Sequence, residues 1–171
     1  MDIKAAETLA KALIKKHWLL GWEFKWTNSK RAFGVCSVSS KGKFIKLSKP
    51  LVSLNPIEQV TDTILHEIAH ALVGNKHGHD KVWKAKCIEI GARPVACYDV
   101  KEIVEPQMRY VAICGACNYK HQRARKPNPY QKFSCRCQHG KPWNLRLLLR
   151  YVDTKTVSIS IKLPSYGRTA E

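Results

Sequence analysis

An α+β fold is predicted for this chain of 171 residues: helices beside a small antiparallel sheet, followed by a cysteine-rich module. The first observation is an apolar stripe of helical periodicity between residues 56 and 73. The second is a set of short β-branched and aromatic runs between residues 22 and 48. The third is a cluster of four cysteines between residues 114 and 137. The length suits one main domain with a modest appendage, and we divide the chain into residues 1–105 and 106–171.

The first predicted element is an amphipathic helix over about residues 3–19. Its charged residues interrupt the apolar centre that a signal peptide would need. Ser39 to Lys43 is predicted to turn a hairpin between two of three strands, which lie near residues 22–27, 32–38 and 43–48. The later elements are helices over about 56–73 and 80–90, a connector over 92–107, a ribbon over 108–141, a strand over 156–162 and a loose tail over 164–171.

The helix predicted over residues 56–73 has clear start and stop signals. Asn55 can cap it, Pro56 suits its first position, and Glu58 resembles the third residue of a capping box. Gly74 and Asn75 supply a stop. The apolar residues of this helix fall within about 80° on a helical wheel. They are expected to face the core: Ile57, Val60, Ile64, Ile68 and Ala71.

The middle of this helix contains the motif His66-Glu67-x-x-His70, on the side away from the apolar stripe. Two histidines four residues apart lie on one helix face, one turn above the other, so both can reach a single Zn²⁺ ion. Glu67 is close enough to hold the water that zinc activates without being a ligand itself. The motif is typical of zinc proteases, and the alternative is a surface helix with two solvated histidines.

A catalytic zinc needs a third protein ligand and an open position for water. The candidates are His77, His79 and Glu89. The metzincin pattern is excluded, because Val73 and Lys76 stand where that class has glycine and histidine. Glu89 lies on the second helix at the spacing of gluzincins, and His79 lies at the entry to that helix. Spacing alone does not choose between His79 and Glu89.

These segments together resemble the SprT-like metalloprotease family, over roughly residues 5–145. The resemblance rests on His66 to Ala71, on Gly78-His79 with an aromatic Trp83 four residues later, and on two upstream segments, Trp22–Trp26 and Arg31–Cys36. It implies a zincin-like helical platform with a C-terminal zinc ribbon. It also implies that His66, His70 and His79 bind the catalytic zinc and that Glu67 is the catalytic acid and base.

A second metal site is predicted from the pairs Cys114-x-x-Cys117 and Cys135-x-Cys137. This layout indicates a closed, four-coordinate structural zinc site that stabilises a segment too small for a core of its own. The second pair departs from the more common spacing, so His139 is an alternative ligand for Cys135 or Cys137. Free buried thiols are the remaining alternative. The isolated cysteines are expected in the core: Cys36, Cys87 and Cys97.

Seven cysteines, four of them clustered, indicate metal binding in a reducing compartment rather than a disulfide framework. We therefore expect a cytoplasmic protein, nucleoid-associated in a prokaryote or nuclear in a eukaryote. No apolar run approaches the length of a membrane helix, so no membrane partner is expected.

Positive charge is concentrated in the C-terminal part of the chain. Residues 1–105 contain 17 Lys and Arg against 11 Asp and Glu, whereas residues 106–171 contain 13 against two. In the ribbon loop, Tyr119 to Phe133, basic residues alternate with aromatic ones, which suits phosphate contacts combined with base stacking. A solubilising surface is the alternative. The candidate nucleic-acid contacts are Lys120, Arg123, Arg125, Lys126, Tyr130, Lys132 and Phe133.

The leading hypothesis is a zinc-dependent endopeptidase with one catalytic and one structural zinc ion. The resemblance implies action on proteins that are associated with or crosslinked to DNA, whether single-stranded or duplex. One rival is a zinc-dependent nucleic-acid-binding protein with a vestigial protease site, although such a protein has no need for Glu67. A second rival is a metallohydrolase of a non-protein amide or a small peptide.

Overall fold

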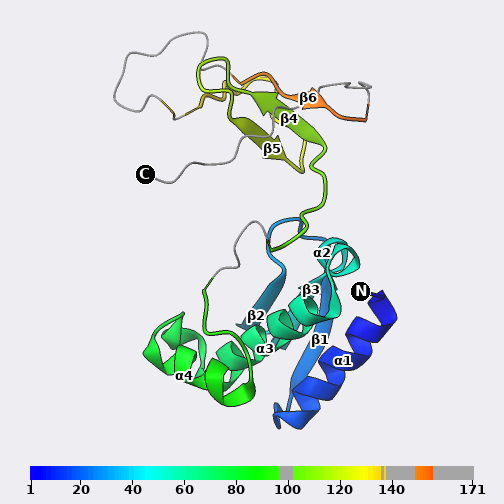
Figure 1. Ribbon diagram of the computed structural model, residues 1–171, viewed down its shortest axis with the longest axis vertical. Coiled ribbons are helices and arrows are strands. Elements are labelled where there is room, and N and C mark those ends of the chain that lie inside the picture. The colour runs from blue at the N-terminus through cyan, green and yellow to red at the C-terminus, as the bar shows by residue number, and fades with distance from the viewer. Residues whose placement is uncertain (97–101, 136, 138–148, 156–171) are drawn as a thin grey trace. The chain divides into compact units, whose positions relative to one another are not determined.

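The computed structural model describes residues 1–96, 102–135, 137 and 149–155 and divides into two compact units, Met1–Pro106 and Gln107–Glu171. The predicted strand at 156–162, the tail at 164–171, Cys97 and His139 lie outside the described residues. The fold is α+β, as predicted (Figure 1). None of the described helices is both long and apolar enough to cross a membrane.

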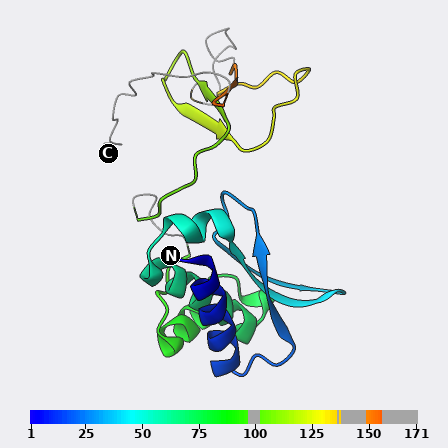
Figure 2. The same ribbon diagram turned by 90° about the vertical axis from the view of Figure 1, so that its right-hand side faces the viewer.

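The first unit packs its longest helices on one face of a three-stranded sheet (Figure 2). Its helices are α1 (Ile3–Lys16), α2 (Lys49–Leu54), α3 (Ile57–Val73) and α4 (Lys81–Ile90), with a short 3-10 turn, η1 (Asn75–His77). Its strands are β1 (Trp22–Thr27), β2 (Gly34–Ser39) and β3 (Gly42–Ser48), in the order β1-β3-β2.

This sheet is mixed, so the prediction of an antiparallel sheet is wrong for one of its two pairings. Strands β2 and β3 form the expected antiparallel hairpin, in register from Gly34↔Leu47 to Ser39↔Gly42. Strand β1 pairs with the other edge of β3 and is parallel to it. The prediction fails at this pairing because β3, the last of the three strands in sequence, lies between β1 and β2 in the sheet. Apolar alternation assigns the faces of a strand but does not identify its neighbours.

The core lies between the sheet and the helices. From α1 it takes Ala6, Ala10 and Ile14, which recur at helical spacing and are buried. The predicted stripe of α3 supplies Val60, Ile64 and Ile68, all fully buried, whereas Ile57 at the helix start is 51% exposed. The isolated Cys87 on α4 is a core residue, as expected. The buried faces of α1 and α3 thus fix the helices against the sheet.

Asn55 does not cap α3, contrary to the sequence-based prediction. Its side-chain amide donates to the carbonyls of Leu51 and Val104, and its oxygen accepts the N–H of Val104 at 2.8 Å. Helix α3 instead starts after Pro56 without a side-chain cap. Asn55 therefore binds the connector segment, and its buried polar atoms find their partners there.

The second unit is a small antiparallel sheet in the order β5-β4-β6, made of β4 (Tyr110–Ile113), β5 (Lys120–Arg123) and β6 (Val152–Asp153). Its buried cluster contains Ala112, Cys114, Cys135 and Leu149. Two of these four residues are cysteines, which agrees with a module held by a metal rather than by a large apolar core.

Candidate active site

Three histidine side chains of the first unit converge on one point. The Nε2 atom of His79 lies 3.3 Å from that of His66 and 3.2 Å from that of His70. A tetrahedral ion with metal–nitrogen bonds of about 2.0–2.1 Å separates its nitrogen ligands by about 3.4 Å. Burial lowers the pKa of His66 to about 4 and also lowers the pKa of His70, which favours the neutral imidazole that binds metals. These three residues can therefore hold a metal ion.

The turn between α3 and α4 brings His79 back over α3. Gly74, at φ 85°, ends α3 in a conformation that other residues rarely adopt. Asp80 caps α4 by accepting the N–H groups of Val82 and Trp83. His79 directly precedes this cap, so its position is set by the start of α4.

The two other candidates for the third ligand are engaged elsewhere. His77 Nδ1 lies 2.9 Å from a carboxylate oxygen of Asp80, and Glu89 forms a 2.6 Å ion pair with Lys86 on the exposed side of α4. Neither belongs to the histidine cluster. The spacing between His70 and Glu89 resembles that of gluzincins, but here the histidine before α4 joins the cluster.

The Trp83 ring packs against the three imidazoles. Its ring centroid lies 4.7 Å from that of His66, 5.1 Å from that of His70 and 4.6 Å from that of His79, and the residue is fully buried. The sequence identified Trp83 as part of a motif but assigned it no role. Its contact with all three histidine rings limits the space open to them and so favours their convergence.

Glu67 lies next to the cluster and against strand β2. It is only 7% exposed, and this burial raises the pKa of its carboxyl to about 7. The backbone N–H of Cys36 donates to the carboxylate. A Cβ atom at Gly34 would lie 2.5 Å from Glu67 Oε1, so only glycine leaves room for this side chain. Sequence analysis missed this role, although a glycine inside a strand is a signal of close approach.

The second unit gathers four cysteine sulfurs. The Sγ atoms of Cys114 and Cys137 are 3.8 Å apart, and those of Cys117 and Cys135 are 3.7 Å apart. Zinc–sulfur bonds of about 2.3 Å in a tetrahedron predict about 3.8 Å. Burial opposes ionisation of Cys114, but the N–H groups of Ala116 and Cys117 lower its thiol pKa to about 7. The four sulfurs fit a closed structural metal site.

The predicted nucleic-acid residues fall into two groups. Arg125, Lys126, Tyr130 and Lys132 are exposed, and Tyr130 reaches 94%. The half-buried group is Lys120, Arg123 and Phe133. The Arg123 guanidinium lies 4.0 Å above the Phe133 ring, which also packs edge-on against Tyr151. Phe133 is therefore part of the packing of the second unit, whereas the Tyr130 ring is exposed to solvent.

An open hollow of about 460 Å³ lies beside this loop. Aromatic rings and a basic side chain meet in its lining, which includes Tyr110, Lys126, Phe133 and Tyr151. The same lining includes the carboxylate of Asp153, which pairs with Arg109 at 2.9 Å.

The α+β fold and the histidine cluster define a protein related to metalloproteases. The model of the SprT-like family matches residues 5–103, more than half of the chain, so this protein belongs to the SprT-like family. The family resemblance seen in the sequence is thereby confirmed.

Two relatives carry the same name, DNA-dependent metalloprotease SPRTN. The one from Xenopus tropicalis is 28% identical over 141 residues, which cover 74% of this chain and 31% of that protein. The one from Danio rerio is 41% identical over 58 residues, which cover 32% of this chain and 9% of that protein. The chain thus spans less than a third of the length of these relatives.

Proposed function

We propose that this protein is a zinc-dependent endopeptidase that cleaves proteins bound or crosslinked to DNA. The observation that carries the proposal is the convergence of three imidazole nitrogens at about zinc-ligand spacing, with the buried carboxylate of Glu67 on the same helix as His66 and His70. A binding module would need the ligands but not this carboxylate. His66, His70 and His79 are the proposed ligands of the catalytic zinc.

When bound, zinc supplies Lewis acidity that polarises a carbonyl and lowers the pKa of water. Glu67 then acts as the general base, taking a proton from the attacking water and passing it to the leaving nitrogen. Burial moves the pKa of the carboxyl toward neutrality, where an acid–base group works best, and the backbone N–H of Cys36 partly opposes this by favouring the ionised form. A bound cation favours the ionised carboxylate, which is the form that accepts the proton.

We further propose that the cysteine cluster holds a structural zinc ion and that the second unit binds DNA. Support comes from the excess of 13 basic over two acidic residues in 106–171 and from the exposed Tyr130. The two relatives are named as DNA-dependent enzymes. Proteolysis would therefore take place in a reducing compartment that contains DNA, because four thiols must stay available as ligands.

The test is to incubate the protein with DNA and a DNA-binding protein and to compare wild type with Glu67→Gln. The variant should keep both metal ions and its folded state but lose about 10²–10⁴-fold in cleavage rate, because only proton transfer is removed. Zinc content and circular dichroism provide the controls. Equal cleavage by the two proteins would refute the proposal. Cleavage of a non-protein amide alone would favour the metallohydrolase alternative.

A further inference from the structure

Helix α1 ends in a turn that places a tryptophan where glycine is usual. The N–H of Trp18 donates to the carbonyl of Lys15, and the N–H of Leu19 donates to that of Ile14. This pair of bonds is the Schellman arrangement, in which the residue after the cap takes the left-handed conformation. That residue is Trp18, at φ 54°. Helix α4 ends with Gly91 in the same region, at φ 83°, so the chain uses glycine for this purpose elsewhere.

Stability does not explain the choice of Trp18. A large side chain in the left-handed region costs free energy that glycine avoids. Burial could offset this cost, but Trp18 is 83% exposed. Leu20, two residues later, is also 83% exposed, whereas Leu19 between them packs against the core. The turn therefore holds two large apolar side chains in solvent on a backbone that is fixed by hydrogen bonds.

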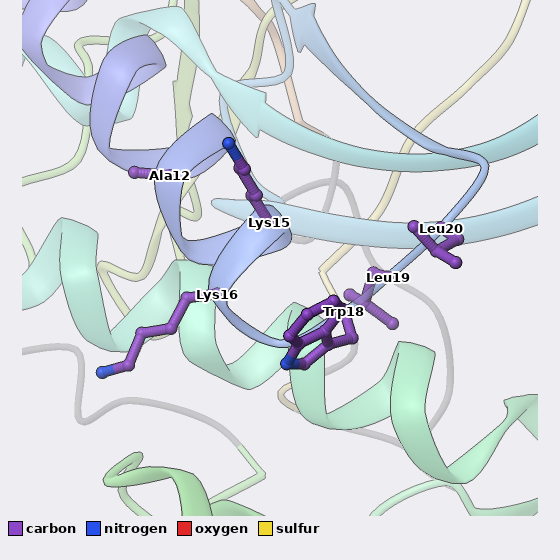
Figure 3. A pocket seen from close by; sticks show the side chains of 6 residues that line it. All are labelled: Ala12, Lys15, Lys16, Trp18, Leu19 and Leu20. Atoms are coloured by element: carbon purple, nitrogen blue, oxygen red, sulfur yellow. The ribbon is translucent and has the colours of Figure 1, made fainter.

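These side chains border an open hollow of about 500 Å³ (Figure 3). Its other lining residues are Ala12, Lys15, Lys16 and Leu19. Lys11, slightly earlier on the helix, pairs with Glu7 at 2.7 Å. No carboxylate in the described part of the chain forms an ion pair with Lys15 or Lys16. The amino groups of Lys15 and Lys16 point away from Trp18 (Figure 3), so the hollow has an apolar lining with two cations at its margin that can pair with a partner's carboxylates.

We propose that this hollow is a docking site for an acidic peptide segment of a partner protein, with a large apolar side chain inserted beside Trp18. Carboxylates next to that side chain would pair with Lys15 and Lys16. Ala12, Leu19 and Leu20 give the hollow an aliphatic lining, which matches an apolar side chain better than it matches the polar edges of a nucleotide base. The site is independent of the metal centre and needs neither proteolysis nor DNA.

Trp18→Gly is a suitable test variant because glycine favours the conformation of this turn. We expect an unchanged or higher melting temperature, together with loss of the docking side chain. Random peptides of about a dozen residues, displayed on phage, would be selected on the full-length protein and depleted on Trp18→Gly. The expected sequences contain a large apolar residue next to one or more Asp or Glu.

Binding of a selected, dye-labelled peptide is then measured by fluorescence anisotropy of the dye, with three variants. Trp18→Gly and the pair Lys15→Glu, Lys16→Glu should each weaken binding at least fivefold, whereas Lys11→Glu, outside the hollow, should not. The charge-reversed pair should instead bind a copy of the peptide in which Lys replaces Asp and Glu.

Three results would overturn the proposal. The first is a selection that yields no Trp18-dependent sequences, or yields sequences without acidic residues. The second is loss of affinity in Trp18→Gly for an oligothymidylate or for vesicles of phosphatidylserine, with no effect on peptides. The third is a large drop in the melting temperature of Trp18→Gly, which would assign Trp18 a structural role.

Discussion

The Glu67 carboxylate is positioned by strand β2 as well as by its own helix. Cys36 supplies an N–H donor, and Gly34 supplies the space that a side chain would fill. Burial opposes ionisation of Glu67. The N–H of Cys36 acts in the opposite direction and stabilises the charged carboxylate that the proposed reaction uses. The strand thus contributes backbone atoms to the site. Glycine is needed at position 34 because a Cβ atom there would clash with the Glu67 side chain, not because the backbone conformation requires it.

Gly34→Ala should displace the Glu67 carboxylate while the three histidines stay in place. Misplacing a catalytic group by about 1 Å can cost about 10²-fold in rate, so we expect a fall of that order in kcat with little change in zinc content. Ser37→Ala, on the same strand, is the control. Full activity in Gly34→Ala would show that Glu67 tolerates a different position.

The choice of third ligand can be tested with one pair of variants. His79→Ala should weaken metal binding at the histidine cluster, because two imidazoles then remain. Glu89→Ala should leave the metal in place, because Glu89 pairs with Lys86 on the exposed side of α4. Competition with a zinc chelator measures both affinities. Retention of the metal by His79→Ala and its loss from Glu89→Ala would reverse the assignment.

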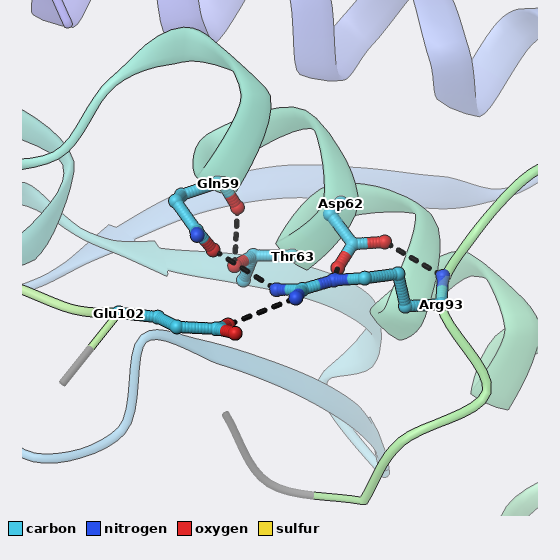
Figure 4. A network of polar contacts seen from close by, with 5 residues as sticks. All are labelled: Gln59, Asp62, Thr63, Arg93 and Glu102. Atoms are coloured by element: carbon cyan, nitrogen blue, oxygen red, sulfur yellow. Dashed lines mark hydrogen bonds and ion pairs between the residues drawn. The ribbon is translucent and has the colours of Figure 1, made fainter. Parts of the chain in front are cut away.

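At the scale of elements, the connector after α4 forms hydrogen bonds with α3 through Arg93 and with Asn55, just before α3, through Val104. Arg93 binds Asp62 through its backbone N–H and its guanidinium, and the guanidinium also contacts Gln59 and Glu102 (Figure 4). The other contact is the pair of hydrogen bonds between Asn55 and Val104. The Arg93 side chain is 43% exposed, so solvent screens its ion pairs and they contribute less to stability than the hydrogen bonds of the buried Asn55 amide.

Asn55→Ala should lower the free energy of unfolding by about 1–3 kcal/mol, because the N–H and carbonyl of Val104 and the carbonyl of Leu51 lose their partner. Hydrogen exchange at Val104 should become faster in this variant. Arg93→Ala is the comparison and should change the unfolding free energy by less than about 1 kcal/mol. An equal loss in both variants would mean that the ion pairs are stronger than their exposure suggests.

How far the sequence predicts this molecule depends on whether a signal is local. Periodicity and stop residues located α3 and α4 to within one or two residues, and motif spacing identified His66, Glu67 and His70. The resemblance, rather than spacing, selected His79. Helix α2 was missed, because six residues carry too little periodicity to be recognised. The pairing of β1 and the bonds of Asn55 depend on residues distant in sequence, so no local pattern could reveal them. A glycine in a predicted strand signals a close approach at Gly34, but only the structure identifies Glu67 as the side chain that approaches.

At the scale of the whole molecule, the proposed catalytic residues and most of the net positive charge lie in different units. The histidine cluster lies in residues 1–106, and most of the net positive charge lies in the remainder, with the cysteine cluster. A polyanion that binds the second unit would concentrate the protein on the polymer that also holds its substrates. On this proposal, DNA raises the cleavage rate by proximity, without a change at the histidine cluster.

Neutralising exposed charges of the ribbon loop should separate DNA-stimulated cleavage from cleavage itself. The suitable triple variant is Arg125→Gln, Lys126→Gln, Lys132→Gln; Arg123 is kept because its guanidinium packs on Phe133. For every phosphate that the variant no longer neutralises, the slope of log affinity against log salt should fall by about 0.7 for single strands and about 0.9 for duplex. Anisotropy titrations at two salt concentrations measure this slope.

The same variant should cleave a free unfolded peptide at the wild-type rate, because the histidine cluster and Glu67 are unchanged, while its cleavage of a DNA-bound protein should fall. Tyr130→Ala in place of the charge changes should weaken binding to single strands more than to duplex, since stacking on an exposed ring needs an unpaired base. If the basic excess serves only solubility, the triple variant will keep both its DNA affinity and its response to DNA.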